Sequence, residues 1–577
     1  MPKARTIGAL WRNAAARASS RAPYLAERDG TWVEVSWPEA ARRVDNLANG
    51  LLALGVKKGD AFSIFASTTL EWCLFDFALG LIGAIGAPVY ANSSARDAAY
   101  VLGHSEAIGV LVEDDEQWAT IESVQDELPK LRHLLAFADL PQLEDRGREH
   151  AAAHPDALAD AEAAVDEEDL FTYIYTSGTT GPPKGCMIRH RNYYEMAAVV
   201  DKMPKRFVGP DDTLLLYLPL AHNYGRLIHL QARYVGYTLA LCSDPLHVGE
   251  ALTRVRPTTF PSVPRVYEKV HTAVVSGLDD AHGAKRAIGQ WALRVGKEVS
   301  RRRQAGEPIP RLLDVQHRLA DRLVYSKVKA RLGGRLRLAN LGGAPLSREV
   351  IELFAAFDLP IYEGYGLTEC TTAASVNRPD AFKFGTVGKP LPGVEVRLAE
   401  DGELELRSET VFAGYLKDLE ATREVLREDG WLRTGDIAVI DEDGFISITD
   451  RKKDILVTAG GKNVAPQNLE NDLKASRFVS QAIVIGDRRP YVAALLTLDR
   501  EEIAKWRADG GRDEAALVQG IVDGVNEQRS RYEQIKRFEV LPRDFSAEEG
   551  EITPTLKLRR GVVQEHFATE IERLYAS

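Results

Sequence analysis

A segment rich in glycine and hydroxyl residues, 175–185, constrains the fold of this chain more than any other stretch. Its sequence is Tyr-Thr-Ser-Gly-Thr-Thr-Gly-Pro-Pro-Lys-Gly, and it follows the run 170–175, whose β-branched and aromatic residues predict a strand. Glycines let the backbone approach a bulky anion, and hydroxyl and backbone N–H groups donate to phosphate oxygens. A flexible loop at a strand end therefore predicts nucleotide triphosphate binding in an α/β fold. The candidate phosphate-binding residues are Thr176, Ser177, Gly178, Thr179, Thr180, Gly181 and Lys184.

The order of residues in this loop differs from the Walker A pattern, in which a hydroxyl residue directly follows the lysine. Here Lys184 follows two prolines and precedes Gly185. A glycine-rich surface turn is the simplest alternative. The whole string resembles the phosphate loop of the adenylate-forming superfamily, which comprises acyl-CoA synthetases, luciferases and the adenylation domains of peptide synthetases. The resemblance extends over roughly residues 10–570, with the family's motifs in order.

Composition is that of an ordinary globular protein of two or more domains, with 577 residues, 45% hydrophobic and 27% charged. Four scattered cysteines argue against a disulfide framework or a zinc site and fit a reducing cytosol. No signal peptide is visible at the start, and the most apolar run, 73–90, is too short and broken for a membrane span. We expect a cytoplasmic location.

Charge is distributed unevenly along the chain. The net charge is −11, but residues 281–337 contain 15 Lys and Arg against 4 acids. The acidic remainder argues against nucleic-acid binding. Within the basic segment, two apolar stripes recur at helical spacing, and 306–310 separates two predicted helices. Either these stripes pack and the basic face is solvated, or the segment meets anionic lipid at the inner face of a membrane or a phosphate-rich cosubstrate. The stripes are Ile288, Trp291, Val295 and Val299, and Leu312, Val315, Leu319 and Leu323.

Secondary-structure patterns predict an α/β protein. Residues 1–170 alternate helical and strand-like runs, which favours parallel sheets of βα units. The segment 151–168, rich in alanine and aspartate, is expected to be a loose connection. Strand-like pieces after Gly385 predict a small β-barrel-like subdomain. We expect a large N-terminal domain, residues 1–450, followed by a small mobile α/β domain, residues 451–577.

A second motif, Tyr362-Glu-Gly-Tyr-Gly-Leu-Thr-Glu369, resembles the family's next nucleotide-binding segment. The resemblance implies that the Tyr365 ring stacks on adenine and that Thr368 donates to phosphate. Glu369 offers the hard carboxylate oxygen that Mg²⁺ prefers. A surface turn with a helix cap is the alternative. The glycine-containing segment 341–346 resembles the loop on the adenine side. Further candidate ATP-binding residues in these two segments are Gly343, Ala344, Glu363 and Gly364.

Three later motifs complete the series. Trp431-Leu-Arg-Thr-Gly-Asp436 matches the motif whose aspartate accepts hydrogen bonds from both ribose hydroxyls, and Arg451 matches the arginine that reaches the same ribose. Glu551-Ile-Thr-Pro-Thr-Leu-Lys557 resembles the motif with the catalytic lysine. A solvated surface charge is the alternative for Arg451 and for Lys557.

The resemblance implies a two-step ligase that uses ATP, Mg²⁺ and coenzyme A. A carboxylate attacks the α-phosphate to give acyl-AMP and pyrophosphate, and the thiol of coenzyme A then takes the acyl group. Lys557, Lys184 and Mg²⁺ on Glu369 would neutralise the charges that meet. Between steps the small domain would rotate at Lys453. The coenzyme A channel would then be lined by Gly460, Gly461 and Lys462.

The identity of the acid is indicated by two segments. Residues 450–466 and the helical insertion at 281–330 look like those of long-chain fatty acyl-CoA synthetases. The segment 217–225 matches the substrate-side motif, in which His222 and Tyr224 gate an acyl tunnel; a hydrogen-bonded core histidine is the alternative for His222. Other hypotheses are a fatty acyl-AMP ligase that serves a carrier protein, a synthetase for shorter or aromatic acids, an ATP-driven switch, and a non-catalytic acyl-binding protein.

Overall fold

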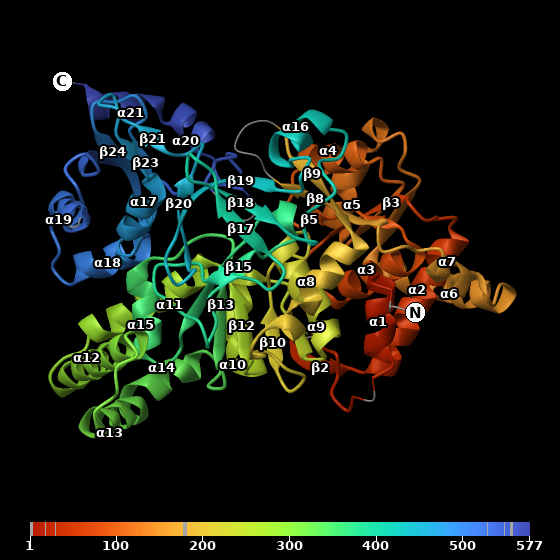
Figure 1. Cartoon of the computed structure of the whole chain (residues 1–577), viewed down its shortest axis with the longest axis horizontal. Coiled ribbons are helices and arrows are strands. Elements are labelled where there is room, and N and C mark those ends of the chain that lie inside the picture. Colours follow the sequence, from red (N-terminus) through yellow and green to blue (C-terminus); the bar gives the residue numbers. More distant parts are fainter. Residues whose placement is uncertain are drawn as a thin grey trace.

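The structure, a computed structural model, describes residues 4–17, 19–28, 30–176, 182–527, 529–546, 548–553 and 558–576. Two mostly parallel sheets form the large N-terminal part, and an antiparallel sheet connects it to a small C-terminal α/β part. Figure 1 shows the first 170 residues at the right and the C-terminal part at the upper left. The expected α/β fold is confirmed.

The first parallel sheet carries the glycine-rich loop. Its strand order is β7-β6-β3-β4-β8-β9, and β5 pairs with β3. Only the β8–β9 pair is antiparallel among these pairings, and its register sets Thr176 opposite Lys184. The predicted strand before the loop is thus confirmed. The strands are β3 (Ala61–Ala66), β4 (Ile85–Gly86), β5 (Val89–Tyr90), β6 (Gly109–Val112), β7 (His133–Ala136), β8 (Leu170–Thr176) and β9 (Lys184–Arg189).

Helix α3 (Leu70–Ile82) is the most apolar helix of this region. The Thr69 side chain caps its N-terminus by accepting from the Trp72 N–H, and Gly83 ends it with φ +71°. Twelve of its residues are buried, which explains the apolar run. None of the helices in the described ranges is long and apolar enough to cross a membrane. The other helices are α1 (Ile7–Ala15), α2 (Trp37–Ala53), α4 (Ala95–Ser105), α5 (Asp115–Glu122), α6 (Leu140–Ala153) and α7 (Ala157–Ala163).

The expectation of a loose connection at 151–168 is wrong over part of its length. Helix α6 runs to Ala153, and Ala157–Ala163 forms α7. Alanine has the highest helix propensity, and Leu158 and Ala161 pack against the main hydrophobic core. Local propensity and burial together therefore order a segment that its composition made look like a linker.

The second sheet has nine strands in the order β16-β15-β14-β13-β12-β10-β11-β1-β2. The strands from β1 to β14 along this order are parallel, so their carboxyl ends meet at one edge. Its strands are β1 (Tyr24–Arg28), β2 (Thr31–Val35), β10 (Thr213–Leu216), β11 (Thr238–Leu241), β12 (Thr259–Ser262), β13 (Leu338–Leu341), β14 (Ile361–Tyr365), β15 (Ser375–Val376) and β16 (Lys389–Pro390). The accompanying helices are α8 (His190–Lys202), α9 (Asn223–Val235), α10 (Val248–Val255), α11 (Pro264–Asp279) and α15 (Arg348–Ala356).

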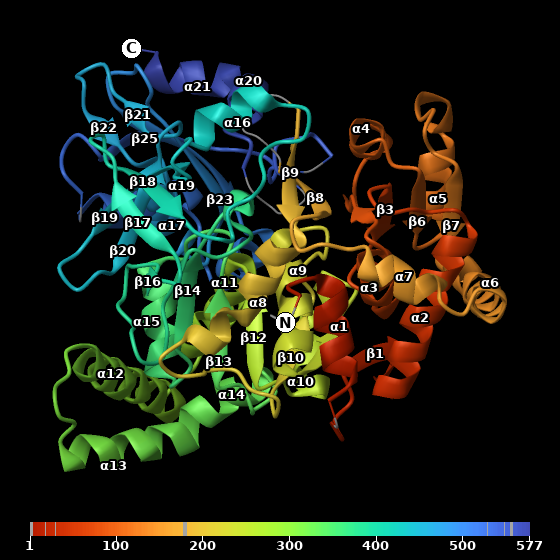
Figure 2. The same cartoon turned by 45° about the vertical axis from the view of Figure 1, so that its right-hand side comes forward.

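The basic segment forms a helical hairpin that projects from the body in both views (Figures 1 and 2). Its helices are α12 (Ala284–Gln304), α13 (Arg311–Ala320), the π-helical turn Asp321–Tyr325 and α14 (Ser326–Arg331). The break at 306–310 is confirmed. In the first stripe, Val295 and Val299 are buried as expected, whereas Ile288 is 40% exposed. The packing interpretation is wrong for the second stripe: Leu312, Val315, Leu319 and Leu323 are 71%, 61%, 49% and 38% exposed. The α13 region instead turns His317, Ala320 and Tyr325 inward.

The β-rich region after Gly385 is confirmed as a four-stranded antiparallel sheet, in the order β17-β18-β19-β20. Helix α16 (Leu419–Val425) is inserted between its middle strands. The strands are β17 (Glu395–Leu398), β18 (Glu403–Arg407), β19 (Leu432–Ile440) and β20 (Ile446–Arg451).

The C-terminal part has its own hydrophobic clusters on both faces of a three-stranded sheet. It touches the N-terminal part along α11, where Ser276 donates to Glu502 at 2.9 Å and Arg265 to the Ser480 carbonyl at 3.4 Å. The elements are β21 (Leu456–Val457), β22 (Asn463–Val464), α17 (Pro466–Lys474), β23 (Val479–Ile485), β24 (Val492–Leu498), α18 (Arg500–Ala508), α19 (Glu514–Glu527), β25 (Ile535–Val540), α20 (Arg560–His566) and α21 (Ala568–Tyr575).

Candidate active site

The two ends of the glycine-rich loop are held together by the β8–β9 hairpin. The Thr176 hydroxyl donates to the Lys184 carbonyl at 3.4 Å, across the last register pair. Residues Ser177, Gly178, Thr179, Thr180 and Gly181 lie outside the described residues. Lys184 is half-exposed, so its ammonium group is available to a ligand at the end of the hairpin.

A tyrosine that the sequence motifs did not include, Tyr415, joins Lys184 to Glu369. The Lys184 Nζ lies over the Tyr415 ring, 5.1 Å from its centre, and the Tyr415 hydroxyl donates to Glu369 Oε1 at 2.6 Å. Burial and the adjacent Glu369 charge raise the pKa of Tyr415, so this hydroxyl stays protonated. Lys184 also forms an ion pair with Asp418, with Nζ and Oδ2 3.9 Å apart.

Backbone pairing places Tyr415 beside the loop. The segment 413–416 runs along β9: the Ala413 N–H donates to the Met187 carbonyl and the Leu416 N–H donates to the Gly185 carbonyl, both at 2.8 Å. A sequence signal for this residue is the neighbouring Gly414. Its φ of +126° favours glycine, and a Cβ added there would lie 2.7 Å from the Thr422 side chain.

The predicted ribose-binding pair is assembled by the antiparallel sheet. Asp436 on β19 faces Arg451 on β20, with Oδ1 3.5 Å from the arginine Nε. From the neighbouring sheet, the Tyr365 hydroxyl donates to Asp436 Oδ2 at 2.5 Å. Burial, and secondly the Asp436 charge, raise the pKa of Tyr365 well above its ordinary value. Three residues predicted from separate motifs are thus in direct contact.

The segments around β13 and β14 carry the other predicted nucleotide-binding residues. Gly343 adopts φ +89° in the exposed loop that contains Ala344, and Gly364 lies on β14. Glu363 is buried, and its Oε1 accepts from the Leu346 N–H at 3.5 Å. Burial raises the pKa of Glu363 to about 8. Thr368 is buried at the start of the short 3₁₀ helix Thr368–Cys370, which carries Glu369.

The substrate-side motif contacts these segments at the start of α9. His222 is the N-cap, and its Nδ1 accepts from the Tyr224 N–H at 3.2 Å, so the histidine is a half-buried capping residue. Tyr224 packs against the adenine-side loop, since a Cβ on Gly342 would come within 3.0 Å of its ring. Thr372 donates to the Asn223 carbonyl at 3.1 Å and ties α9 to the Glu369 segment.

The residues predicted to bind coenzyme A are not brought to this site. Gly460, Gly461 and Lys462 form the turn between β21 and β22, where the Ala459 N–H donates to the Arg489 carbonyl and Lys462 lies over the Tyr532 ring. These contacts are all within the C-terminal part. Lys453 is exposed in the turn after β20.

The predicted catalytic Lys557 lies outside the described residues. On either side of it, Ile552 and Leu558 form an antiparallel bridge. The neighbouring Glu551 is fully buried and accepts from Arg543 at 2.6 and 2.7 Å and from the Ser546 N–H at 3.0 Å. The described residues on either side of 554–557 are therefore fixed to the C-terminal part.

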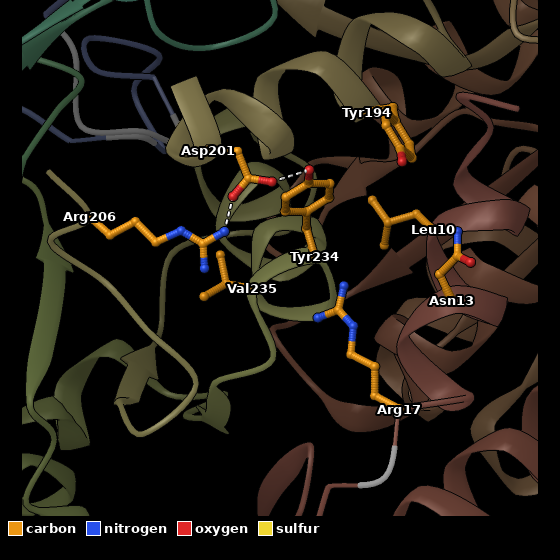
Figure 3. A pocket seen from close by; sticks show the side chains of 8 residues that line it. All are labelled: Leu10, Asn13, Arg17, Tyr194, Asp201, Arg206, Tyr234 and Val235. Carbon is orange, nitrogen blue, oxygen red and sulfur yellow. Dashed lines mark hydrogen bonds and ion pairs between the residues drawn. The ribbon is translucent and has the colours of Figure 1, made fainter. Parts of the chain in front are cut away.

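A cavity of about 300 Å³ lies elsewhere, between α1, α8 and α9 (Figure 3). In it, Asp201 accepts from Tyr234 at 2.7 Å and pairs with Arg206. None of the predicted nucleotide-binding residues lines it, so it is separate from the candidate site. Its lining residues are Leu10, Asn13, Arg17, Tyr194, Asp201, Arg206, Tyr234 and Val235.

The donor set at Glu369 fits Mg²⁺. Mg²⁺ is usually bound by one or two carboxylates together with substrate phosphates. Glu369 presents one carboxylate beside the hairpin that bears the loop. No group of three or more His, Cys, Asp or Glu that could hold a metal occurs in the ranges that the structure describes. All four cysteines are free and buried.

Two family models match the chain. An AMP-binding enzyme model matches residues 10–416, and a model of the AMP-binding enzyme C-terminal domain matches residues 453–577. Among curated proteins, the long-chain-fatty-acid–CoA ligase FadD15 of Mycobacterium tuberculosis is 39% identical over 562 residues, which cover 95% of this chain and 93% of the relative. The long-chain-fatty-acid–CoA ligase ACSBG2 of Xenopus laevis is 31% identical, with 96% and 81% covered.

Solved structures of similar fold include the adenylation domain of a carboxylate reductase from Mycobacterium chelonae. It is 24% identical with a TM-score of 0.79, and the match covers 99% of this chain and 91% of that one. A fatty acyl CoA synthetase of Mycobacterium tuberculosis is 22% identical with a TM-score of 0.64, and 98% and 99% are covered. The matched models, the full-length relatives and the shared fold agree with the motifs: this chain belongs to the AMP-binding enzyme family, the adenylate-forming superfamily.

Proposed function

We propose that this protein is an AMP-forming long-chain fatty acid:CoA ligase. The observation that carries the proposal is the match along nearly the whole chain with relatives named for this activity. The contacts of Tyr365, Asp436 and Arg451, and of Lys184, Tyr415 and Glu369, support the nucleotide half of the reaction.

In this proposal the nucleotide lies across the junction of the two parallel sheets and the antiparallel sheet. Asp436 accepts from the ribose hydroxyls with Arg451 beside it, and the Tyr365 ring, held by Asp436, stacks on adenine. The backbone of Gly343, Ala344, Glu363 and Gly364 borders the base. Thr368, Lys184 and the loop from Thr176 to Gly181 contact the phosphates. Because the Glu363 side chain is buried, this residue would contact the adenine base through its backbone atoms.

Acyl-AMP formation brings a carboxylate to a phosphate, so the site must neutralise two anions. Lys557 bridges the acid and the α-phosphate oxygen, and Lys184 stabilises the departing pyrophosphate. When bound at Glu369, Mg²⁺ supplies Lewis-acid polarisation of the phosphate oxygens. The acyl carbonyl is then attacked by the thiol of coenzyme A, and AMP leaves.

We further propose that the chain divides at residues 450–451 and that the C-terminal part rotates about Lys453 between the two steps. The turn of Gly460, Gly461 and Lys462 would then replace the Lys557 segment at the site. Polar contacts such as Ser276 to Glu502 and Arg265 to Ser480 would break in this rotation without disturbing either hydrophobic core.

Release of pyrophosphate from MgATP, measured with acids from C4 to C18, tests the proposed activity. Each buried methylene adds about 0.8 kcal/mol of binding, so turnover should rise toward C14–C18, with AMP and acyl-CoA as products. A maximum at acetate or aromatic acids contradicts the long-chain assignment. Acyl-AMP that accumulates in the presence of coenzyme A favours a carrier-protein acceptor, and ADP as product contradicts the reaction class.

We propose that the α12–α13 hairpin makes peripheral contact with an anionic membrane. Leu312, Val315, Leu319 and Leu323 form an exposed apolar stripe. Exposed arginines lie next to these residues along the chain, at positions 311, 318 and 322, and Arg318 is paired with Asp314. Apolar residues interleaved with cations suit a lipid surface, and the acidic remainder of the chain would orient the hairpin toward it.

A further inference from the structure

Tyr415 lies between two residues to which the proposed function gives separate tasks. Tyr415 is 8% exposed, its hydroxyl donates to Glu369 Oε1 at 2.6 Å, and Lys184 Nζ is 5.1 Å from the ring centre. We infer that Tyr415 is a positioning residue for both: its hydroxyl orients the Glu369 carboxylate for the metal, and its ring supports Lys184 beside the phosphates. The inference rests on the proposed function.

The backbone of Tyr415 is fixed from two sides. One side is the pairing with β9, through Ala413, Met187 and Leu416. On the other side, the Tyr415 N–H donates to the Thr422 hydroxyl of α16 at 2.9 Å. The Phe412 ring packs edge-on against the Tyr415 ring, with centres 5.0 Å apart. A ring held in this way can act as a fixed platform and does not need to be ordered when substrate binds.

The hydroxyl limits how Glu369 can bind a cation. One of the two carboxylate oxygens, Oε1, accepts the short hydrogen bond from Tyr415. The other oxygen, Oε2, would then be left to hold Mg²⁺, which usually takes one or two protein carboxylates together with substrate phosphates. Hydrogen bonds to a ligating carboxylate commonly alter metal affinity by 10- to 100-fold.

The ring has a second effect, on the lysine. A cation over an aromatic face is attracted to it, so the Tyr415 ring holds the ammonium group of Lys184 near the residue that binds Glu369. In the described residues, Lys184 forms an ion pair with Asp418, with Nζ and Oδ2 3.9 Å apart. Both side chains are half-exposed, so the pair is weak. Lys184 therefore remains beside the carboxylate that holds the metal and stays free to meet phosphate oxygens.

Two substitutions separate these effects. Tyr415→Phe keeps the ring and removes the hydroxyl, so the affinity for Mn²⁺, measured by electron paramagnetic resonance in the presence of ATP, should fall about 10-fold. ATP affinity at saturating Mg²⁺, measured by calorimetry, should stay within about twofold of wild type. Tyr415→Leu should show the same metal defect and, in addition, weaker ATP binding at saturating metal.

Tyr325→Phe is the matched control, because Tyr325 donates to the Ala292 carbonyl at 2.6 Å in the distant α12–α13 hairpin. It should leave metal affinity unchanged. Unchanged Mn²⁺ affinity in Tyr415→Phe, whatever its thermal stability, overturns the inference. If wild-type protein binds no Mn²⁺ with ATP, or forms no acyl-AMP, the proposed function fails instead, so the two failures are distinguishable.

Discussion

Asp76 and Arg226 form an ion pair in which both side chains are completely buried. Asp76 lies on α3 and Arg226 on α9; the arginine Nε is 3.2 Å from Asp76 Oδ2, and its Nη1 donates to Thr172 on β8 at 2.6 Å. The guanidinium also lies over the Phe171 ring, 4.5 Å from its centre. The pair therefore connects the helix of the substrate-side motif to the strand that ends in the glycine-rich loop.

Removing one partner of this pair should be severely destabilising. Asp76→Ala leaves a buried guanidinium without its counter-charge, which typically costs about 3–5 kcal/mol. The double variant Asp76→Leu/Arg226→Met removes both charges and should recover part of that loss. Urea unfolding monitored by tryptophan fluorescence measures the difference, because Trp72 lies beside Arg226.

A surface pair provides the comparison. Arg348 and Glu352 are paired at i, i+4 on α15 with side chains 71% and 35% exposed. Glu352→Ala should change the free energy of unfolding by about 0.5 kcal/mol or less. Equal effects of Asp76→Ala and Glu352→Ala would contradict the role of burial.

Glu363 should make stability depend on pH around neutrality. Burial raises its pKa to about 8, whereas an unfolded chain has the ordinary value near 4.5. The folded state then binds more protons between these values, so stability falls as pH rises from about 4.5 to 8. Glu363→Gln should remove this slope, by up to a few kcal/mol across the window, in denaturation midpoints measured from pH 5 to 9. A slope that persists unchanged in the variant would refute the assignment.

Glu551 should affect the pH dependence of stability in the opposite direction to Glu363: it should stabilise the fold more as pH rises. Burial alone would raise its pKa, but hydrogen bonds from Arg543 and His566 outweigh it and lower the pKa to about 2. Its contribution to stability is complete above about pH 4.5 and is lost as pH falls toward 2. Glu551→Gln should therefore be less stable than wild type at pH 7, and the gap should narrow by pH 3. Thermal unfolding at both pH values checks this, and a constant gap would count against it.

Much of this architecture could be predicted from local sequence. The strand at 170–175, the alternation of helices and strands before residue 170 and the break at 306–310 all follow from periodicity and turn residues. The contact of Tyr365 with Asp436 could be expected only from the family resemblance, because the two residues are on different sheets. Spacing along the chain carries no information on that contact.

The predictions that failed, and the residue that was missed, depend on tertiary contacts. Helix α7 is stabilised by Leu158 and Ala161 against the core, which composition does not reveal. The α13 stripe has the periodicity of a packed face, yet its leucines point to solvent while His317 and Tyr325 turn inward. Tyr415 reaches the site through backbone pairing with β9, more than 220 residues earlier in the sequence.

Lys557→Ala tests whether the Lys557 segment and the turn of Gly460 and Lys462 serve different steps of the reaction. If Lys557 serves only acyl-AMP formation, the variant should lose pyrophosphate release almost completely. Thioester formation from supplied acyl-AMP should be largely retained, because that step would use the turn of Gly460 and Lys462. Separate assays of the two half-reactions measure this. Equal loss in both would show that one arrangement serves both steps.

The exposed α13 stripe should determine binding to anionic lipid. Leu312→Ser/Leu319→Ser removes two leucines that are 71% and 49% exposed. Burial of a leucine is worth about 1.5–3 kcal/mol, so cosedimentation with phosphatidylserine-containing vesicles should weaken at least 10-fold. Pure phosphatidylcholine vesicles should bind wild type weakly, because the arginines of α13 add about 1 kcal/mol each at an anionic surface.

Leu246→Ser is the control variant, since Leu246 is 85% exposed in another part of the molecule. Equal vesicle binding by wild type, the double variant and Leu246→Ser would contradict the lipid-binding role of the stripe. So would a dimer that wild type forms without vesicles and that the double variant does not form.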